Sequence, residues 1–149
     1  MKQSKHLVIL PKEKAIPDFA WWFGCADEYL NYALLKTHDK AHTLFQLRLS
    51  FEFTLKAATV GLMNKLIKTR NPYKLFAQAA LVVPYIKNIF PGDTSEEAWL
   101  FSLLVPRRKH ERPVASVKLS ARDLAILIQR IEALQTMVKA EFVTTYRDR

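Results

Sequence analysis

The C-terminal part of the chain places the strongest constraint on the fold. The segment Ser120-Ala121-Arg122-Asp123 has the pattern of a helix capping box, and apolar residues then recur at every third or fourth position. These apolar residues are Leu124, Leu127, Ile128, Ile131, Leu134, Val138 and Phe142. Such spacing predicts a long helix with one apolar face. The chain of 149 residues contains only 3 glycines, which favours helices joined by short connections over a turn-rich β fold.

We therefore predict a mainly α fold, an up-down helical bundle of about five helices. Half of the residues are apolar, enough for one core, and no low-complexity linker divides the chain. Residues 1–149 are expected to form a single domain, with an extended N-terminal segment over 1–17 and the bundle over 18–145.

Local signals predict where the other helices begin. Asp18 is a candidate cap for the first helix, and Asn71-Pro72 is typical of another helix start, with that helix ending or kinking near Pro84. The segment from Thr94 to Glu97 resembles a capping box and predicts a further short helix.

Residues 45–56 carry conflicting signals. They alternate between apolar and polar types without a break, a pattern typical of a strand. However, no turn signal follows before Asn71-Pro72, and a strand of that length would be longer than most. We favour a helix over residues 41–69, in which Arg48, Glu52 and Lys56 form a polar stripe. The alternative is an α+β fold with strands near residues 45–56 and 114–119.

The charge distribution indicates an acidic partner. The formal net charge is +9, and no acidic residue occurs between Glu52 and Asp93. Within that acid-free region we expect four residues to contact nucleic acid: Lys65, Lys68, Arg70 and Lys74. An anionic membrane is disfavoured because no basic amphipathic helix with a purely apolar face is evident. RNA is the favoured nucleic acid.

A second basic segment lies between Pro106 and Pro113. It contains Arg107, Arg108, Lys109, His110 and Arg112. Because proline disfavours helix before it and lacks a backbone donor, the segment is expected to be a solvent-facing loop. Its four cations are predicted to contact nucleic acid phosphates, and His110 adds a group that titrates near neutral pH. The competing interpretation is a solvated loop that only keeps the protein soluble.

The sequence predicts neither a metal site nor a cofactor. The single cysteine, Cys25, has no partner for a disulfide, and His38 and His42 are expected to be a surface pair because no suitable Glu or Cys accompanies them. No glycine-rich phosphate loop and no hydrolase nucleophile turn occur. No apolar run is long enough to span a bilayer or serve as a secretory signal, so a cytoplasmic location is expected.

The first predicted helix has apolar residues on two sides. Beside its main apolar stripe runs a second row, formed by Trp21, Cys25, Tyr29 and Tyr32. A small bundle usually covers only one side of a peripheral helix. We therefore expect a homodimer or a place in a larger complex, with this row near the contact.

Taken in order, these parts resemble the HEPN superfamily of small helical bundles. Ser50 to Ala57 is similar to the second helix of that family, in which a Glu precedes a Leu-Lys-Ala run. Asn71 to Phe76 is similar to the start of its third helix. The basic segment from Arg107 to Pro113 and the start of the last helix, Ser120 to Leu124, follow in the same order, so the resemblance covers residues 18–145.

The resemblance implies an RNA-related function. Many HEPN proteins are metal-independent RNases in which an Arg and a His four to six residues beyond it meet across a homodimer. The nearest equivalents here are Arg107 or Arg108 with His110, a spacing shorter than the family pattern. The resemblance would make His110 and Arg108 the catalytic pair, whereas the short spacing favours binding without cleavage. Two alternatives are a non-catalytic subunit of a larger nucleoprotein complex and an α+β single-strand binder.

Overall fold

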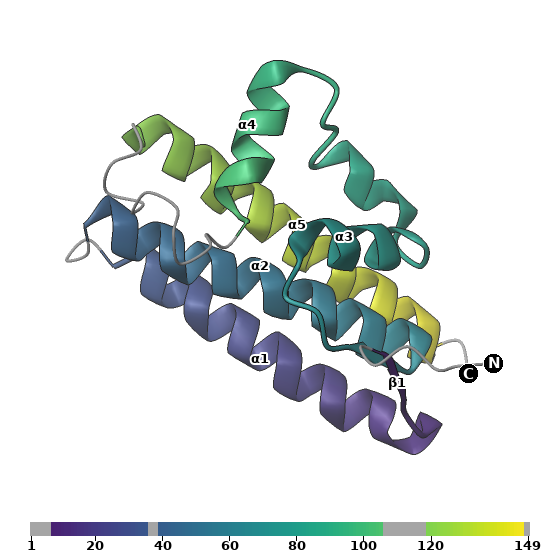
Figure 1. Cartoon of the computed structure of the whole chain (residues 1–149). Coiled ribbons are helices and arrows are strands. Elements are labelled where there is room, and N and C mark those ends of the chain that lie inside the picture. The colour runs from purple at the N-terminus through teal and green to yellow at the C-terminus, as the bar shows by residue number, and fades with distance from the viewer. Residues whose placement is uncertain (1–6, 36–38, 106–118, 148–149) are drawn as a thin grey trace.

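The protein is mainly α-helical. The computed structural model describes residues 7–35, 39–105 and 119–147. Its elements are β1 (Leu7–Ile9), η1 (Lys12–Lys14), α1 (Ala15–Ala33), α2 (Lys40–Met63), β2 (Lys65–Ile67), α3 (Pro72–Ala80), η2 (Pro84–Asn88), α4 (Ser95–Leu103) and α5 (Ala121–Arg147). The three long helices α1, α2 and α5 form the body of the bundle, and α3 and α4 pack along it (Figure 1). The prediction of a helical bundle is confirmed.

The long helices do not all alternate in direction. The helices α1 and α2 are antiparallel neighbours, and the Ser50 hydroxyl on α2 donates to the Ala26 carbonyl on α1 at 2.8 Å. In contrast, α5 runs parallel to α2 because α3, η2 and α4 carry the chain back to the end at which α2 began (Figure 1). Gln135 accordingly reaches Ser50, while Tyr146 donates to the carbonyl of Gly61 further along both helices.

Helix α2 is the centre of the bundle, and this explains its alternating sequence. Leu47, Phe51 and Leu55 are fully buried, but so are polar residues on the other sides of the helix. Those polar side chains are satisfied locally: the Thr54 hydroxyl donates to the Ser50 carbonyl at 2.7 Å, and the Gln135 amide contacts both hydroxyls. Since buried polar groups are tolerated only when they are hydrogen-bonded, this network allows a polar residue at alternate positions of a buried helix.

The alternative strand over residues 45–56 is wrong, and the predicted helix 41–69 was too long. Asn64 adopts a left-handed conformation, with φ of 54°, and ends α2. The chain then forms β2, which pairs antiparallel with β1, and Leu7 lies opposite Ile67. The proposed strand at 114–119 falls mostly outside the described residues.

The first helix begins earlier than predicted. It starts at Ala15, so that Pro17 and Asp18 both lie in its first turn. Proline is tolerated there because the first backbone N–H groups have no partner within the helix. The other predicted caps are confirmed, with Asn71, Thr94 and Ser120 each accepting a hydrogen bond from the first turn that follows.

Among residues 7–35, 39–105 and 119–147, none of the helices combines the length and the apolar character needed to cross a bilayer.

Candidate nucleic-acid interface

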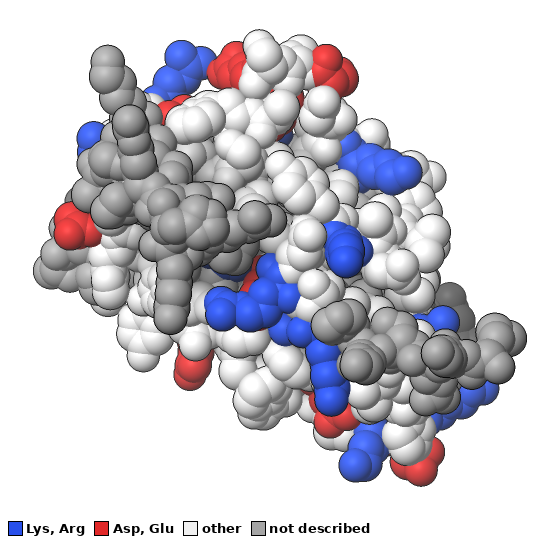
Figure 2. Space-filling view, viewed as in Figure 1, with Lys and Arg blue, Asp and Glu red and all other residues white. Residues whose placement is uncertain are grey.

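The four described cations that the sequence singled out lie on one short stretch between α2 and α3. Lys65 is in β2 and is half-buried, Lys68 and Arg70 follow it and are exposed, and Lys74 is exposed on the first turn of α3. Figure 2 shows Lys and Arg side chains gathered over α2 and α3 near the middle of one face, with the carboxylates mostly toward its edges. The four cations predicted from the sequence therefore lie on neighbouring elements: β2, the segment after it and the first turn of α3.

Two local periodicities shape a hollow on this surface. Side chains alternate along an extended chain, so Lys65, Ile67 and Thr69 share one side, and Leu7 joins them from the paired strand. Along α3, residues 74, 77 and 78 share one side because they are three and four positions apart. Together these residues line a cavity of about 350 Å³. We call it the lysine hollow; its lining is Leu7, Lys65, Ile67, Thr69, Lys74, Ala77 and Gln78.

The lysine hollow is suited to an anion. Among the described residues, its lining includes two lysines, one threonine and one glutamine but no Asp or Glu. Within the described part of the chain, Lys65, Lys74 and Gln78 have no side-chain hydrogen bond or ion pair of their own. Because no neighbouring acid neutralises them, the two lysines keep their positive potential for a ligand.

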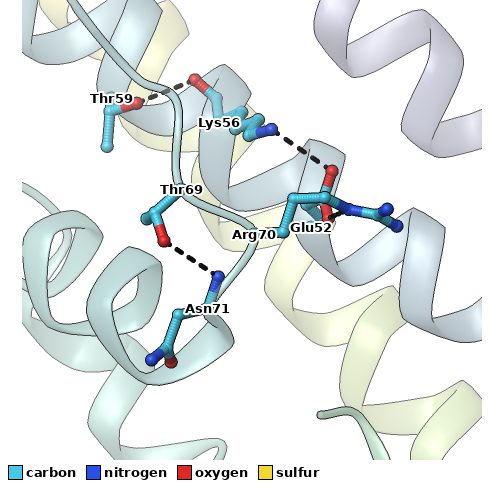
Figure 3. A network of polar contacts seen from close by, with 6 residues as sticks. All are labelled: Glu52, Lys56, Thr59, Thr69, Arg70 and Asn71. Carbon is cyan, nitrogen blue, oxygen red and sulfur yellow. Dashed lines mark hydrogen bonds and ion pairs between the residues drawn. The ribbon is translucent and has the colours of Figure 1, made fainter. Parts of the chain in front are cut away.

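Lys68 and Arg70 lie on the opposite side of the extended segment, and there Arg70 joins a buried ion pair. The carboxylate of Glu52 accepts from Lys56 Nζ at 3.2 Å and from Arg70 Nε at 3.1 Å (Figure 3). The side chains of Glu52 and Lys56 are only 8% and 9% exposed. Lys56 also lies 5.5 Å from the centre of the Trp22 ring, a cation–π contact. One carboxylate thus faces two cations, which leaves a net positive cluster.

A turn before α3 aims Arg70 at Glu52. The backbone N–H of Asn71 donates to the Thr69 hydroxyl at 3.1 Å, and the Asn71 side chain caps α3 by accepting from the N–H of Tyr73 at 3.0 Å. Thr69 and Arg70 therefore point to opposite sides of the segment (Figure 3). Arg70 is 65% exposed, and its two terminal nitrogens point away from Glu52. A phosphate approaching from solvent would meet those nitrogens.

A second hollow on the other side of α3 is aromatic. It has a volume of about 240 Å³ and is lined by Tyr73, Phe76, Phe90, Gly92, Ala98 and Phe101. Sequence reasoning did not assign it, and it also missed Thr69 and Gln78 in the lysine hollow. The available signal was the run Tyr73-Lys74 directly after a strong helix start, which places an aromatic and a cation side by side on a first turn.

The described residues offer little for other chemistry. Nowhere in ranges 7–35, 39–105 and 119–147 do three His, Cys, Asp or Glu side chains gather as a metal site requires. Burial raises the pKa of the Cys25 thiol, which makes it a poor nucleophile at neutral pH. The predicted loop residues Arg107, Arg108, Lys109, His110 and Arg112 lie outside the described residues, as does His38.

Comparison with known proteins leaves the chain without an assigned family: no family model matches it, and neither a curated protein nor a solved structure does.

Proposed function

We propose that the protein binds nucleic acid, with RNA as the first candidate, through the basic surface formed by β2, the segment after it and the first turn of α3. The observation that carries the proposal is the lysine hollow, where Lys65 and Lys74 line one cavity and none of the other described lining residues is acidic. Lys68 and Arg70 add exposed positive charge on the other side of the same segment. Cations that no local acid neutralises attract a phosphate backbone and speed its association.

The sequence resemblance to the HEPN superfamily adds RNA as the substrate class and a second basic element, the loop with Arg107, Arg108, Lys109 and Arg112. The proposal is limited to binding, because the spacing of the candidate catalytic pair, His110 with Arg108, departs from the family pattern.

The test is a binding titration with salt. Fluorescence anisotropy with a labelled single-stranded RNA would be recorded from about 50 to 300 mM salt for the wild type and for the Lys65→Ala/Lys74→Ala variant. We expect wild-type affinity to fall steeply with salt. Each lost phosphate contact removes about 0.7 from the log–log slope for a single strand, so the double variant should lose about 1.4.

The matched control removes two exposed cations at the other end of the bundle. Lys40 begins α2 and Arg122 lies in the first turn of α5, so Lys40→Ala/Arg122→Ala changes the net charge by the same amount. This control should keep the wild-type slope within error. Equal slopes for the two double variants would remove the lysine hollow from the interface, and a wild type that binds neither RNA nor DNA would end the proposal.

We also propose that a second copy of the chain covers α1. Trp21 is 60% exposed and Tyr32 is 50% exposed at the two ends of the apolar row that the sequence predicted, while Cys25 and Tyr29 between them are half-buried. Large apolar side chains aligned on one helix favour a protein contact, and two-fold dimers are the commonest soluble assemblies.

A further inference from the structure

Tyr73 presents a ring that is fixed in place and open to solvent. Its ring stacks on Phe101 with centroids 4.8 Å apart and planes inclined by 29°. Phe101 is itself buried and packs edge-on against Phe51 and Phe90, so the support beneath Tyr73 belongs to the core. Tyr73 is nevertheless 54% exposed. One face of the ring therefore rests on the protein while the other is available for stacking.

Helix α3 places this ring beside the lysine hollow. Tyr73 and Phe76 line the aromatic hollow, whereas Lys74, Ala77 and Gln78 line the lysine hollow. The two cavities thus flank one helix, whose width is about 10 Å with side chains. A few nucleotides of an extended single strand span that width, so one short stretch of a strand can reach both.

The charges around the two hollows indicate on which side of Tyr73 the phosphates of such a strand would lie. Asp93 follows Gly92 at the far rim of the aromatic hollow, and Glu96 lies on the adjoining α4. On the other side of α3, none of the described residues that line the lysine hollow is acidic. A phosphate next to a base on Tyr73 is therefore repelled from the α4 side and attracted toward Lys74 and Lys65.

We propose that the ligand of this surface is a single-stranded nucleic acid, with one unstacked base on the free face of Tyr73 and the adjacent phosphate held by Lys65 and Lys74. This inference rests on the proposed function. In base-paired strands the bases are stacked on one another, so only a single strand has an unstacked base that can stack on an aromatic ring. Gln78 and Thr69 add amide and hydroxyl groups at the edge of the same hollow.

The experiment compares single-stranded and duplex RNA on variants of Tyr73. Anisotropy with a labelled ten-residue oligouridine and with a labelled RNA duplex would give dissociation constants for wild type, Tyr73→Ala, Tyr73→Leu and Tyr73→Phe. Loss of one base–aromatic stack weakens binding about tenfold. We expect that loss on the single strand for both Tyr73→Ala and Tyr73→Leu, and affinity within about twofold of wild type for Tyr73→Phe, which keeps the ring.

Two controls separate stacking from folding and from general aromatic exposure. Tyr73→Leu keeps an apolar contact with Phe101, so its thermal unfolding should stay close to that of wild type. Tyr85→Ala removes another exposed tyrosine, on η2, and should leave both dissociation constants unchanged. Duplex binding should be nearly the same for all variants.

The outcomes distinguish this inference from the proposed function. Wild-type binding that is salt-dependent but equal in Tyr73→Ala and Tyr85→Ala would overturn the inference and leave the proposed function standing. An equal loss on single strand and duplex would also overturn it. If wild type binds no nucleic acid at all, the proposed function fails and the inference fails with it.

Discussion

Gly61 on α2 lies where all three long helices meet. A Cβ atom added there would lie 2.6 Å from a ring carbon of Phe19 on α1 and 2.9 Å from one of Phe142 on α5. Those two rings stack on each other at 3.7 Å between centroids, so neither can shift toward the other. Gly61→Ala should therefore lower the free energy of unfolding by about 1 to 3 kcal/mol, as overpacking does, despite the better helix propensity of alanine.

Gly24 provides the matched control for this prediction. It also lies inside a helix, α1, but a Cβ atom added there would meet nothing within 4 Å. Gly24→Ala should raise the free energy of unfolding by up to about 1 kcal/mol through helix propensity alone. Urea denaturation followed by circular dichroism measures both changes, and the same sign for both variants would contradict the steric role of Gly61.

Glu52 is buried and its carboxylate pairs with two cations, Lys56 and Arg70. Glu52→Gln would leave the ammonium of Lys56, 9% exposed, without its counter-charge. Removing one partner of a buried ion pair costs about 3 kcal/mol or more. We expect a loss of that size in the free energy of unfolding from urea titration. The exposed Glu132→Gln on α5 should change it by less than about 0.5 kcal/mol, and an equally small effect at Glu52 would mean that Lys56 is solvated.

The site residues that the sequence could predict were those with a charge signal. Lys65 and Lys74 stood out because no acid lies near them in the chain, and the structure places both in one hollow. No such signal marks Thr69, Gln78 or Tyr73. Whether these residues line a hollow depends on which sides of β2 and α3 face outward, and those sides are fixed only when both elements pack against α2.

At the scale of elements, the helices with an amphipathic pattern carried a clear signal, whereas α2 was predicted as a helix against an alternating pattern typical of a strand. The apolar stripe of α5 gave its position, with Leu127, Ile131 and Leu134 fully buried. In α2 the hydrophobic pattern is lost because neighbours surround the helix and even Ser50 and Thr54 are buried. Strand β2 was not predicted. Asn64 ends α2 before it by adopting a left-handed conformation, but asparagine also occurs within helices, so the residue type alone did not mark the end of α2.

An ion pair connects α4 to α5, and its contribution to stability should depend on pH. Arg130 donates to both carboxylate oxygens of Glu97 at 2.7 Å and also to the carbonyl of Ile89. The Arg130 hydrogen bonds hold the pKa of Glu97 below its ordinary value. Because the folded-state pKa is the lower one, the stabilisation is present above the unfolded carboxyl pKa, about 4.5, and is lost as pH falls through the folded value.

We therefore expect Glu97→Gln to lower the free energy of unfolding by about 1 kcal/mol at neutral pH and to approach wild type in acid. Thermal unfolding between about pH 7 and pH 3 would measure the difference. Glu96→Gln removes a charge in the same first turn of α4 without breaking an ion pair within the described residues, and its effect should be smaller because Glu96 acts on Arg130 only through its charge. A difference that does not depend on pH would show that Glu97 acts through packing alone.

For the whole molecule, charge is unevenly distributed over the bundle. The side with β2 and α3 carries the basic surface, whereas α1 contains Asp18, Asp27 and Glu28 but no Lys or Arg. Under the proposed function, we expect a polyanion to approach β2 and α3 rather than α1. The exposed aromatic row on α1 would then be available for the proposed contact with a second copy of the chain.

We predict that two copies of the chain associate through α1. We expect sedimentation velocity to show a concentration-dependent shift from monomer to dimer for the wild type, because a dimer would remove the exposed rings of Trp21 and Tyr32 from water. Trp21→Ser/Tyr32→Ser should remain monomeric at the same concentrations with unchanged helical content, since both side chains lie largely outside the core. Tyr85→Ser alters an even more exposed ring, 70% accessible on η2, and should dimerise as wild type does. A wild type that stays monomeric at the highest concentration would contradict the proposed dimer. The basic surface would be unaffected, because its cations lie on β2, on the segment after it and on α3 rather than on α1.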